Sequence, residues 1–373
     1  MRRDIGDPLM KTERRDPGVQ TLLDEAHMLP DCAARDTLLG QVAKSAEALG
    51  DLDTAWEART AILSSMSSCE SPRFETLFLC LAWCLAMSDR DPERFSPATV
   101  LWQYKWVATH APKYASVPRR VLTRLVEDMD ERFIAVGWGR RAGVHKRLEL
   151  HSLTGDLASA MAMVPEWRAT PRDRGSDCTA CEADTLVGLH VEAREDETAL
   201  REAKQIIRGR LTCATVPHST FGVLLPALSR LGRHDEARKL YQRGRRLATT
   251  TEEAACSLLA PYLAYGAFAG EIDDTLATLR IRLPQAVSLR SDYERADWFG
   301  GAFAALTFLE RSGVGVIELT RVPGIAEEGE SPTAQVAASC HEIALRHARA
   351  LDARNGNTHF TDSLNGICDQ YIA

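Results

Sequence analysis

One short pattern recurs along this chain and constrains its fold more than any other feature. In each copy, an apolar-periodic stretch ends at a turn that carries glycine or acidic residues, and an alanine or threonine follows inside a second such stretch. Glycine tolerates the left-handed backbone that ends a helix, and alanine lets two helices approach closely, so each copy predicts a helix–turn–helix pair. The copies are AEALGDLDTAWEA (46–58), HSLTGDLASAMA (151–162), VEAREDETALREA (191–203), LSRLGRHDEARKLY (228–241) and FAGEIDDTLATL (268–279).

The cleanest copy runs from Pro217 to Thr250. It places apolar side chains on one helical stripe, then a turn glycine and a small residue at the helix crossing. These positions are Phe221, Leu224, Leu225, Leu228, Gly232 and Ala237. Other copies depart at single positions: Arg194 replaces the turn glycine, Thr275 replaces the alanine, and Arg59 replaces an aromatic residue.

These residues resemble the tetratricopeptide repeat, a helix–turn–helix unit of about 34 residues. The resemblance implies an all-α fold, a right-handed superhelical solenoid of antiparallel helix pairs. The chain also resembles bacterial tetratricopeptide proteins that share its Cys-x-x-Cys and Cys-x4-His elements, and that resemblance implies no particular activity. We expect a disordered segment over 1–18, a single solenoid over 19–353 and a C-terminal tail over 354–373. Polar stretches at 168–176 and 314–331 predict further loose segments.

Composition supports this interpretation and excludes some partners. Hydrophobic residues make up 45% of the 373 residues and aromatic residues only 6%, which favours helices over sheets. The net charge of −7 argues against nucleic acid as a partner. No apolar stretch is long enough to span a bilayer or to act as a signal peptide, so we expect a cytoplasmic protein without a membrane partner. Its ten cysteines are then expected to be reduced.

Four residues predict a structural zinc site that joins neighbouring repeats over about 171–250: Cys178, Cys181, Cys213 and His218. Cys178 and Cys213 lie 35 residues apart, and Cys181 and His218 lie 37 apart, each close to one repeat length. All four fall at the start of the first helix of successive repeats, and these helix starts are neighbours in a solenoid. Three sulfurs and one imidazole are typical ligands of tetrahedral Zn²⁺.

Other interpretations of the cysteines remain open at this stage. The thiols can be unligated residues at helix starts, and an iron–sulfur site uses similar ligands. A thioredoxin-like redox pair normally follows a strand, and the sequence shows no strand there. Four protein ligands would leave no coordination position for water, which favours a structural role over a catalytic one.

Two surface groups are candidates for contact with a partner. Trp102, Tyr104 and Trp106 form an aromatic group, which is either a packed helix face or an anchor for a peptide. A basic group is either a solvated helix face or a contact for an acidic partner. Its members are Arg238, Lys239, Arg243 and Arg246.

The sequence therefore predicts a non-catalytic scaffold or adaptor that binds a protein or peptide in a groove lined by the first helices. One alternative is a regulator that responds to a small peptide or ligand, although no helix-turn-helix module is evident at the N-terminus. A zinc-dependent enzyme is a further alternative, and it would require an open coordination position on the metal.

Overall fold

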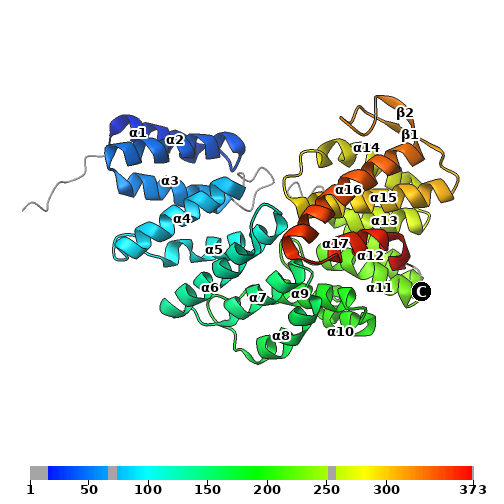
Figure 1. Cartoon of the computed structure of the whole chain (residues 1–373), viewed down its shortest axis with the longest axis horizontal. Coiled ribbons are helices and arrows are strands. Elements are labelled where there is room, and N and C mark those ends of the chain that lie inside the picture. The colour runs from blue at the N-terminus through cyan, green and yellow to red at the C-terminus, as the bar shows by residue number, and fades with distance from the viewer. Residues whose placement is uncertain (1–15, 66–73, 251–257, 372–373) are drawn as a thin grey trace, which may run out of the picture. The chain divides into compact units, whose positions relative to one another are not determined.

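The computed structural model describes residues 16–65, 74–250 and 258–371, and over these residues the chain is almost entirely helical (Figure 1). The all-α class predicted from the sequence is therefore confirmed. None of the described helices is long and apolar enough to cross a lipid bilayer. Most of the segment 1–18, which we expected to be disordered, lies outside the described residues, and the first helix begins at Pro17.

The chain divides into two compact units between Val107 and Ala108, whereas the sequence predicted one array over 19–353. The repeated motif is distributed between them, with its first copy in unit 1 and the other four in unit 2. Unit 1 holds α1 (Pro17–Met28), α2 (Ala33–Leu49), α3 (Leu52–Ser64), α4 (Phe74–Arg90) and most of α5 (Ala98–His110). Between the first two copies, from Arg59 to Leu150, other helices replace the motif, and the division falls there.

Unit 2 contains the remaining elements. It begins with η2 (Ala111–Lys113), α6 (Arg119–Ala135), α7 (Arg141–Leu153), α8 (Leu157–Ala169), α9 (Thr179–Glu192) and α10 (Asp196–Ile207). It continues with α11 (His218–Arg230), α12 (His234–Thr250), α13 (Ala260–Phe268), α14 (Ile272–Ala286) and α15 (Asp292–Arg311). It ends with β1 (Val316–Leu319), β2 (Gly329–Pro332), α16 (Thr333–Asn355), α17 (His359–Asn365) and η4 (Ile367–Tyr371).

Every copy of the motif forms two helices joined by the same kind of turn. In each turn one residue adopts the left-handed backbone, with φ between 59° and 80°. The N–H of the next residue donates to the carbonyl five positions earlier over 2.8–2.9 Å, as from Glu195 to His190. The left-handed residues are Gly50, Gly155, Arg194, Gly232 and Gly270.

The small residue expected at each helix crossing is buried in every pair. Ala55, Ala160, Ala199 and Ala237 are fully buried, and Thr275 is 1% exposed. Thr275 takes the place of alanine without leaving an unsatisfied polar atom, because its hydroxyl donates to the Glu271 carbonyl at 2.9 Å. The repeated turn and the repeated small residue together produce five similar helix pairs.

The three helix pairs from α9 to α14 pack through their first helices. α9 contacts α11, and α11 contacts α13, while the second helices α10 and α12 each contact the first helix that follows. Their shared core includes Val187, Phe221, Leu225 and Leu263. The starts of α9 and α11 are therefore close in space, whereas the solenoid arrangement and its right-handed twist stay predictions.

The segment 314–331, which we expected to be loose, contains an antiparallel hairpin instead. β1 pairs with β2, with Val316 opposite Pro332 and Leu319 opposite Gly329. Alternate side chains of β1 are buried, at Ile317 and Leu319. Four residues are too short a run for a strand pattern to stand out in the sequence, so the hairpin was missed.

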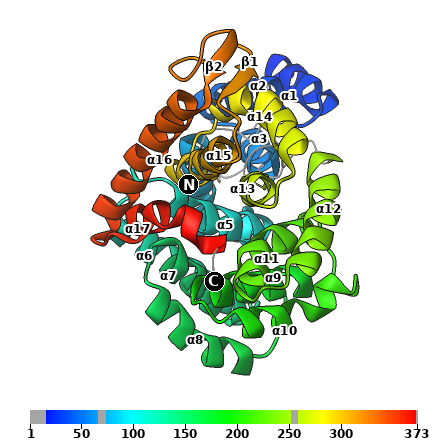
Figure 2. The same ribbon diagram turned by 90° about the vertical axis from the view of Figure 1, so that its right-hand side faces the viewer.

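The C-terminal residues, which we predicted to form a loose tail, fold against unit 2 instead. Figures 1 and 2 show α17, drawn in red, between α16 and the green helices. The Asp352 carboxylate accepts the N–H groups of Phe360 and Thr361, each at 2.9 Å, and so fixes the turn after α16. Tyr371 is 4% exposed and packs against aromatic rings that include Phe268 and Phe308.

Contacts with distant parts of the sequence hold this segment in place. Arg354 donates to the Pro112 carbonyl at 2.8 Å, and Asn357 donates to the Thr154 carbonyl at 2.8 Å. Arg230 of α11 donates to the carbonyl of Gln370 at 3.1 Å. These partners lie 242, 203 and 140 residues apart in the chain, so no local pattern predicts the contacts.

Replacing the left-handed arginine by glycine tests the role of the turns. We expect Arg194→Gly to stabilise the protein by about 0.5–1 kcal/mol, because glycine adopts this backbone without steric cost. Gly232→Ala, at φ 68° with nothing within 4 Å of the added Cβ, should lower stability by a similar amount. Urea unfolding of both variants measures the two changes, and equal signs would contradict this account.

The C-terminal segment should be held more firmly below neutral pH. His359 Nε2 lies 3.2 Å from a Glu192 carboxylate oxygen, and that hydrogen bond raises the pKa of His359. A raised folded-state pKa gives stability that is complete below the unfolded value near 6.5 and is lost as the pH rises through the folded value.

We therefore expect His359→Gln to lower the free energy of unfolding by up to about 1 kcal/mol at pH 6 and to leave it almost unchanged at pH 8.5. Thermal unfolding of the wild type and the variant at both pH values measures this. Equal losses at both values would show that the protonated imidazole is not involved.

Candidate functional site

Three cysteines meet where α9 and α11 begin. Cys178 caps the N-terminus of α9, and its sulfur accepts the N–H of Cys181 at 3.3 Å. Cys213 lies in the loop before α11, where its N–H donates to the Val216 carbonyl at 2.9 Å. The sulfurs of Cys178, Cys181 and Cys213 all lie within 4.8 Å of one another. The structure thus brings together three of the four predicted ligands.

The distances between the sulfurs suit a shared metal ion. Those of Cys178 and Cys181 lie 3.2 Å apart, and all three cysteines are free thiols. Two sulfurs bound to one tetrahedral zinc at about 2.3 Å each would be about 3.8 Å apart, so small movements suffice to ligate an ion. The donor set of three soft sulfurs also fits zinc or another thiophilic metal.

The thiols differ in their tendency to ionise. Burial alone would raise the pKa of Cys178, but hydrogen bonds from the Cys181 N–H and from the thiols of Cys181 and Cys213 outweigh it and lower that pKa. Burial and the neighbouring sulfurs raise the pKa of Cys181. Of these thiols, the thiolate form is therefore favoured at Cys178 and disfavoured at Cys181, and a cation would offset the repulsion between neighbouring thiolates.

His218, the fourth predicted ligand, is not part of the cluster that the three cysteines form. It is the first residue of α11 and is 4% exposed, and burial lowers its pKa, so its ring is neutral near pH 7. Its buried Nε2 has no hydrogen-bond partner among the described residues. A neutral imidazole with an unsatisfied nitrogen retains the lone pair that a metal ligand requires.

A second set of contacts links the same two helix starts. The carboxylate of Asp184 on α9 accepts the hydroxyls of Ser219 and Thr220, at 3.0 and 2.5 Å. Burial raises the pKa of Asp184, and the two hydrogen bonds partly offset that effect. The joint between α9 and α11 is therefore polar at its edge.

A buried charged cluster beside the cysteines was missed from the sequence. His145 and Glu149 lie on α7, and Asp177 directly precedes Cys178; each offers an atom within 4.8 Å of the others. Lys146 lies among them, with its Nζ 2.7 Å from Glu149 and 3.2 Å from Asp177. Burial acts against each charge, but the pair keeps the pKa of Lys146 raised and that of Glu149 lowered.

The members of this second cluster are engaged with one another and with a neighbouring ring. The Lys146 ammonium pairs with both carboxylates, and His145 stacks on Trp167 with ring centroids 4.7 Å apart. Only the spacing of His145, Lys146 and Glu149 on one helix was visible in the sequence. Their partner Asp177 lies 28 residues after Glu149, so the spacing alone could not identify the group.

The predicted aromatic group separates into a buried and an exposed part. Tyr104 is 2% exposed and belongs to the core, whereas Trp102 and Trp106 are 40% and 43% exposed on α5. The Nζ of Lys105 lies 3.6 Å from the centre of the Trp102 ring, which is a close cation–π contact. The two tryptophans are one turn apart on the same helix face.

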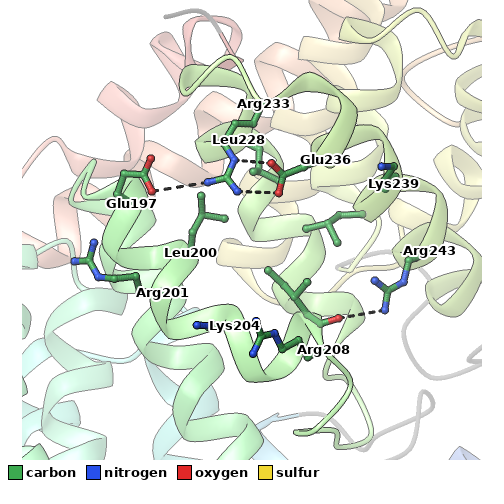
Figure 3. Close-up of a pocket in the computed structure, with 12 residues that line it drawn as sticks. Glu197, Leu200, Arg201, Lys204, Arg208, Leu228, Arg233, Glu236, Lys239 and Arg243 are labelled. Atoms are coloured by element: carbon green, nitrogen blue, oxygen red, sulfur yellow. Dashed lines mark hydrogen bonds and ion pairs between the residues drawn. The ribbon is translucent and has the colours of Figure 1, made fainter.

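The four residues of the predicted basic group do not all lie on one surface. Lys239 and Arg243 line a pocket of about 470 Å³ between α10 and α12 (Figure 3). Arg238 instead faces α14, with Nε 3.3 Å from Glu271, and Arg246 is exposed outside the pocket lining. The pocket lies on the second helices, whereas the sequence predicted a groove on the first helices.

No protein-family model matches this chain, and no curated protein is significantly similar to it.

Proposed function

We propose that this protein is a non-catalytic scaffold with tetratricopeptide-like helix pairs, and that it binds a protein or peptide through a surface that includes α5. The observation that carries the proposal is the exposed pair Trp102 and Trp106, two large aromatic side chains 40% and 43% exposed on one helix face. Exposed tryptophans are favoured anchors for partner proteins. The neutralised state of the His145 cluster supports a non-catalytic role, since Lys146 already pairs with both of its carboxylates.

The second part of the proposal is a structural zinc ion bound by Cys178, Cys181 and Cys213, with His218 as the fourth ligand. The geometry of the three sulfurs supports the first three ligands. The neutral ring and unsatisfied Nε2 of His218 support the fourth, which requires a modest rearrangement at the start of α11. Bound zinc would hold the thiolates together and fix the 208–217 loop against α9.

Zinc would contribute most where the repeats are weakest. The α9–α10 pair has Arg194 in place of the turn glycine, and the polar residues 170–178 form a loop before it. Structural zinc in small peptides contributes roughly 10–16 kcal/mol of apparent binding free energy. Even a fraction of that free energy exceeds the change in stability that most single substitutions cause.

Removing one sulfur tests the zinc site. Protein purified without added metal should carry about one zinc per chain, and Cys213→Ser should lose it together with stability on the order of 3 kcal/mol. Elemental analysis and thermal unfolding measure both effects, and a chelator should reproduce them in the wild type. Cys32→Ser is the matched control, because Cys32 precedes α2 in unit 1 without a side-chain hydrogen bond to the helix start and lies far along the chain from the cluster.

The same assay decides the role of His218. If His218 is a ligand, His218→Ala weakens zinc affinity and shifts the visible spectrum of the cobalt-substituted protein. If the spectrum is unchanged, the fourth position is held by another group and His218 is a core residue. Wild-type protein free of metal, with unchanged stability in chelator, would end the zinc proposal altogether.

Replacing the two tryptophans tests the scaffold. We expect the double variant Trp102→Ser/Trp106→Ser to capture at least about tenfold less of the partner, since each aromatic anchor contributes about 2 kcal/mol or more of binding free energy. Cross-linking in the native cell followed by quantitative mass spectrometry compares this variant with the wild type. Leu79→Ser, which alters a residue 65% exposed on α4 of the same unit, is the control. A set of cross-linked proteins identical in all three samples would contradict the proposal.

A further inference from the structure

The pocket between α10 and α12 has an apolar floor and a basic rim (Figure 3). Leu200 and Ile207 contribute to the floor from α10, Leu240 from α12 and Leu228 from α11. Leu200 and Ile207 are two helical turns apart, so the floor extends about 10 Å along α10. We call this pocket the basic groove; its rim cations are Arg201, Lys204, Arg208, Arg233, Lys239 and Arg243.

The charge of the basic groove is opposite to that of the chain. Its lining holds six basic and two acidic side chains, a net charge of +4, whereas the whole chain carries −7. Both acids are engaged by the same rim residue, since Arg233 lies 2.8 Å from Glu236 and 3.8 Å from Glu197. The excess positive charge is therefore local and faces the open pocket.

Several rim cations of the basic groove lack the ion pairs that other arginines of α12 make. On α12, Arg238 pairs with Glu271, directly before α14, and Arg245 pairs with Asp274 of α14. By contrast, Lys204, Arg208 and Lys239 make no ion pair within the described part of the chain, and all three are exposed.

Arg243 is oriented by two contacts that do not neutralise its charge. It donates to the Ile207 carbonyl at 3.5 Å and lies over the Phe221 ring, 4.9 Å from the centroid. Its guanidinium is thereby fixed at one end of the groove.

The residues of the floor and the rim indicate which class of anionic partner fits the basic groove. Single-stranded nucleic acids bind where aromatic rings stack on the bases, and this floor is made of leucine and isoleucine. A phosphate or another small anion would bind where cations converge, but here they are spread along two helices. Aliphatic side chains flanked by carboxylates match both the floor and the rim, which is the pattern of an acidic amphipathic peptide.

We propose that the basic groove binds an acidic, leucine-bearing segment of another protein. Leucine side chains of that segment fill the space over Leu200 and Leu228, and its carboxylates face Lys204, Arg208 and Lys239. The inference rests on the proposed scaffold function, and it adds a second binding face on the side of the second helices.

A peptide of about 12 residues, glutamate with leucine at every third or fourth position, is the probe. Fluorescence anisotropy measures its binding to the full-length chain at low and moderate salt. We expect Lys204→Glu/Lys239→Glu to weaken binding at least about tenfold and to reduce its salt dependence. The control is Arg120→Glu/Arg349→Glu, which makes the same charge change at exposed residues of unit 2 outside the groove. Unchanged thermal unfolding of both variants shows that each is folded.

Three results would overturn the inference. They are equal binding by the groove variant and the wild type, equal binding of a peptide with serine in place of leucine, and tighter binding of an oligothymidylate of equal charge. Equal binding by the groove variant would show that the peptide binds elsewhere. Equal binding of the serine peptide would show that the apolar floor plays no role. Tighter binding of the oligothymidylate would show that the groove prefers nucleic acid to a peptide. If the peptide fails while the tryptophan-dependent partner still cross-links to the groove variant, the scaffold function stands and only this inference falls.

Discussion

The hydrogen bond that closes each turn between paired helices is the constraint on which this architecture depends. One left-handed residue lets the next N–H reach back to a carbonyl five positions earlier, as from Arg233 to Leu228 at 2.9 Å. That bond reverses the chain, and the buried small residue that follows, such as Ala237, sets how closely the two helices approach. Repetition of this local chemistry, more than any single contact, produces the stacked pairs of unit 2.

The cysteine cluster and the basic groove lie on the same two helix pairs. The cysteines meet at the starts of the first helices α9 and α11, and the groove lies between the second helices α10 and α12. The two are connected through one loop, because Arg208 lines the groove and Cys213 follows five residues later. The segment 208–213 therefore joins the groove to the cysteine cluster.

Sequence reasoning succeeded where the determinants are local and failed where they are distant. The turn glycines, the buried alanines and the meeting of Cys178 with Cys213 follow from short patterns repeated at a fixed spacing. Asp177 beside Lys146 and Tyr371 within an aromatic cluster depend on residues far away in the chain, so no window of sequence shows them. The two strands of four residues were missed for the opposite reason, because they are too short to show an alternation of apolar and polar residues.

The docked C-terminus has a consequence for how the molecule is made. Helix pairs built from local contacts can form as they are synthesised. The hydrogen bonds of Arg354 and Asn357, however, reach back 242 and 203 residues to carbonyls near the beginning of unit 2. These contacts can form only after residues 354–357 have been synthesised, so they join the early and late parts of unit 2 after the local contacts within each helix pair have formed.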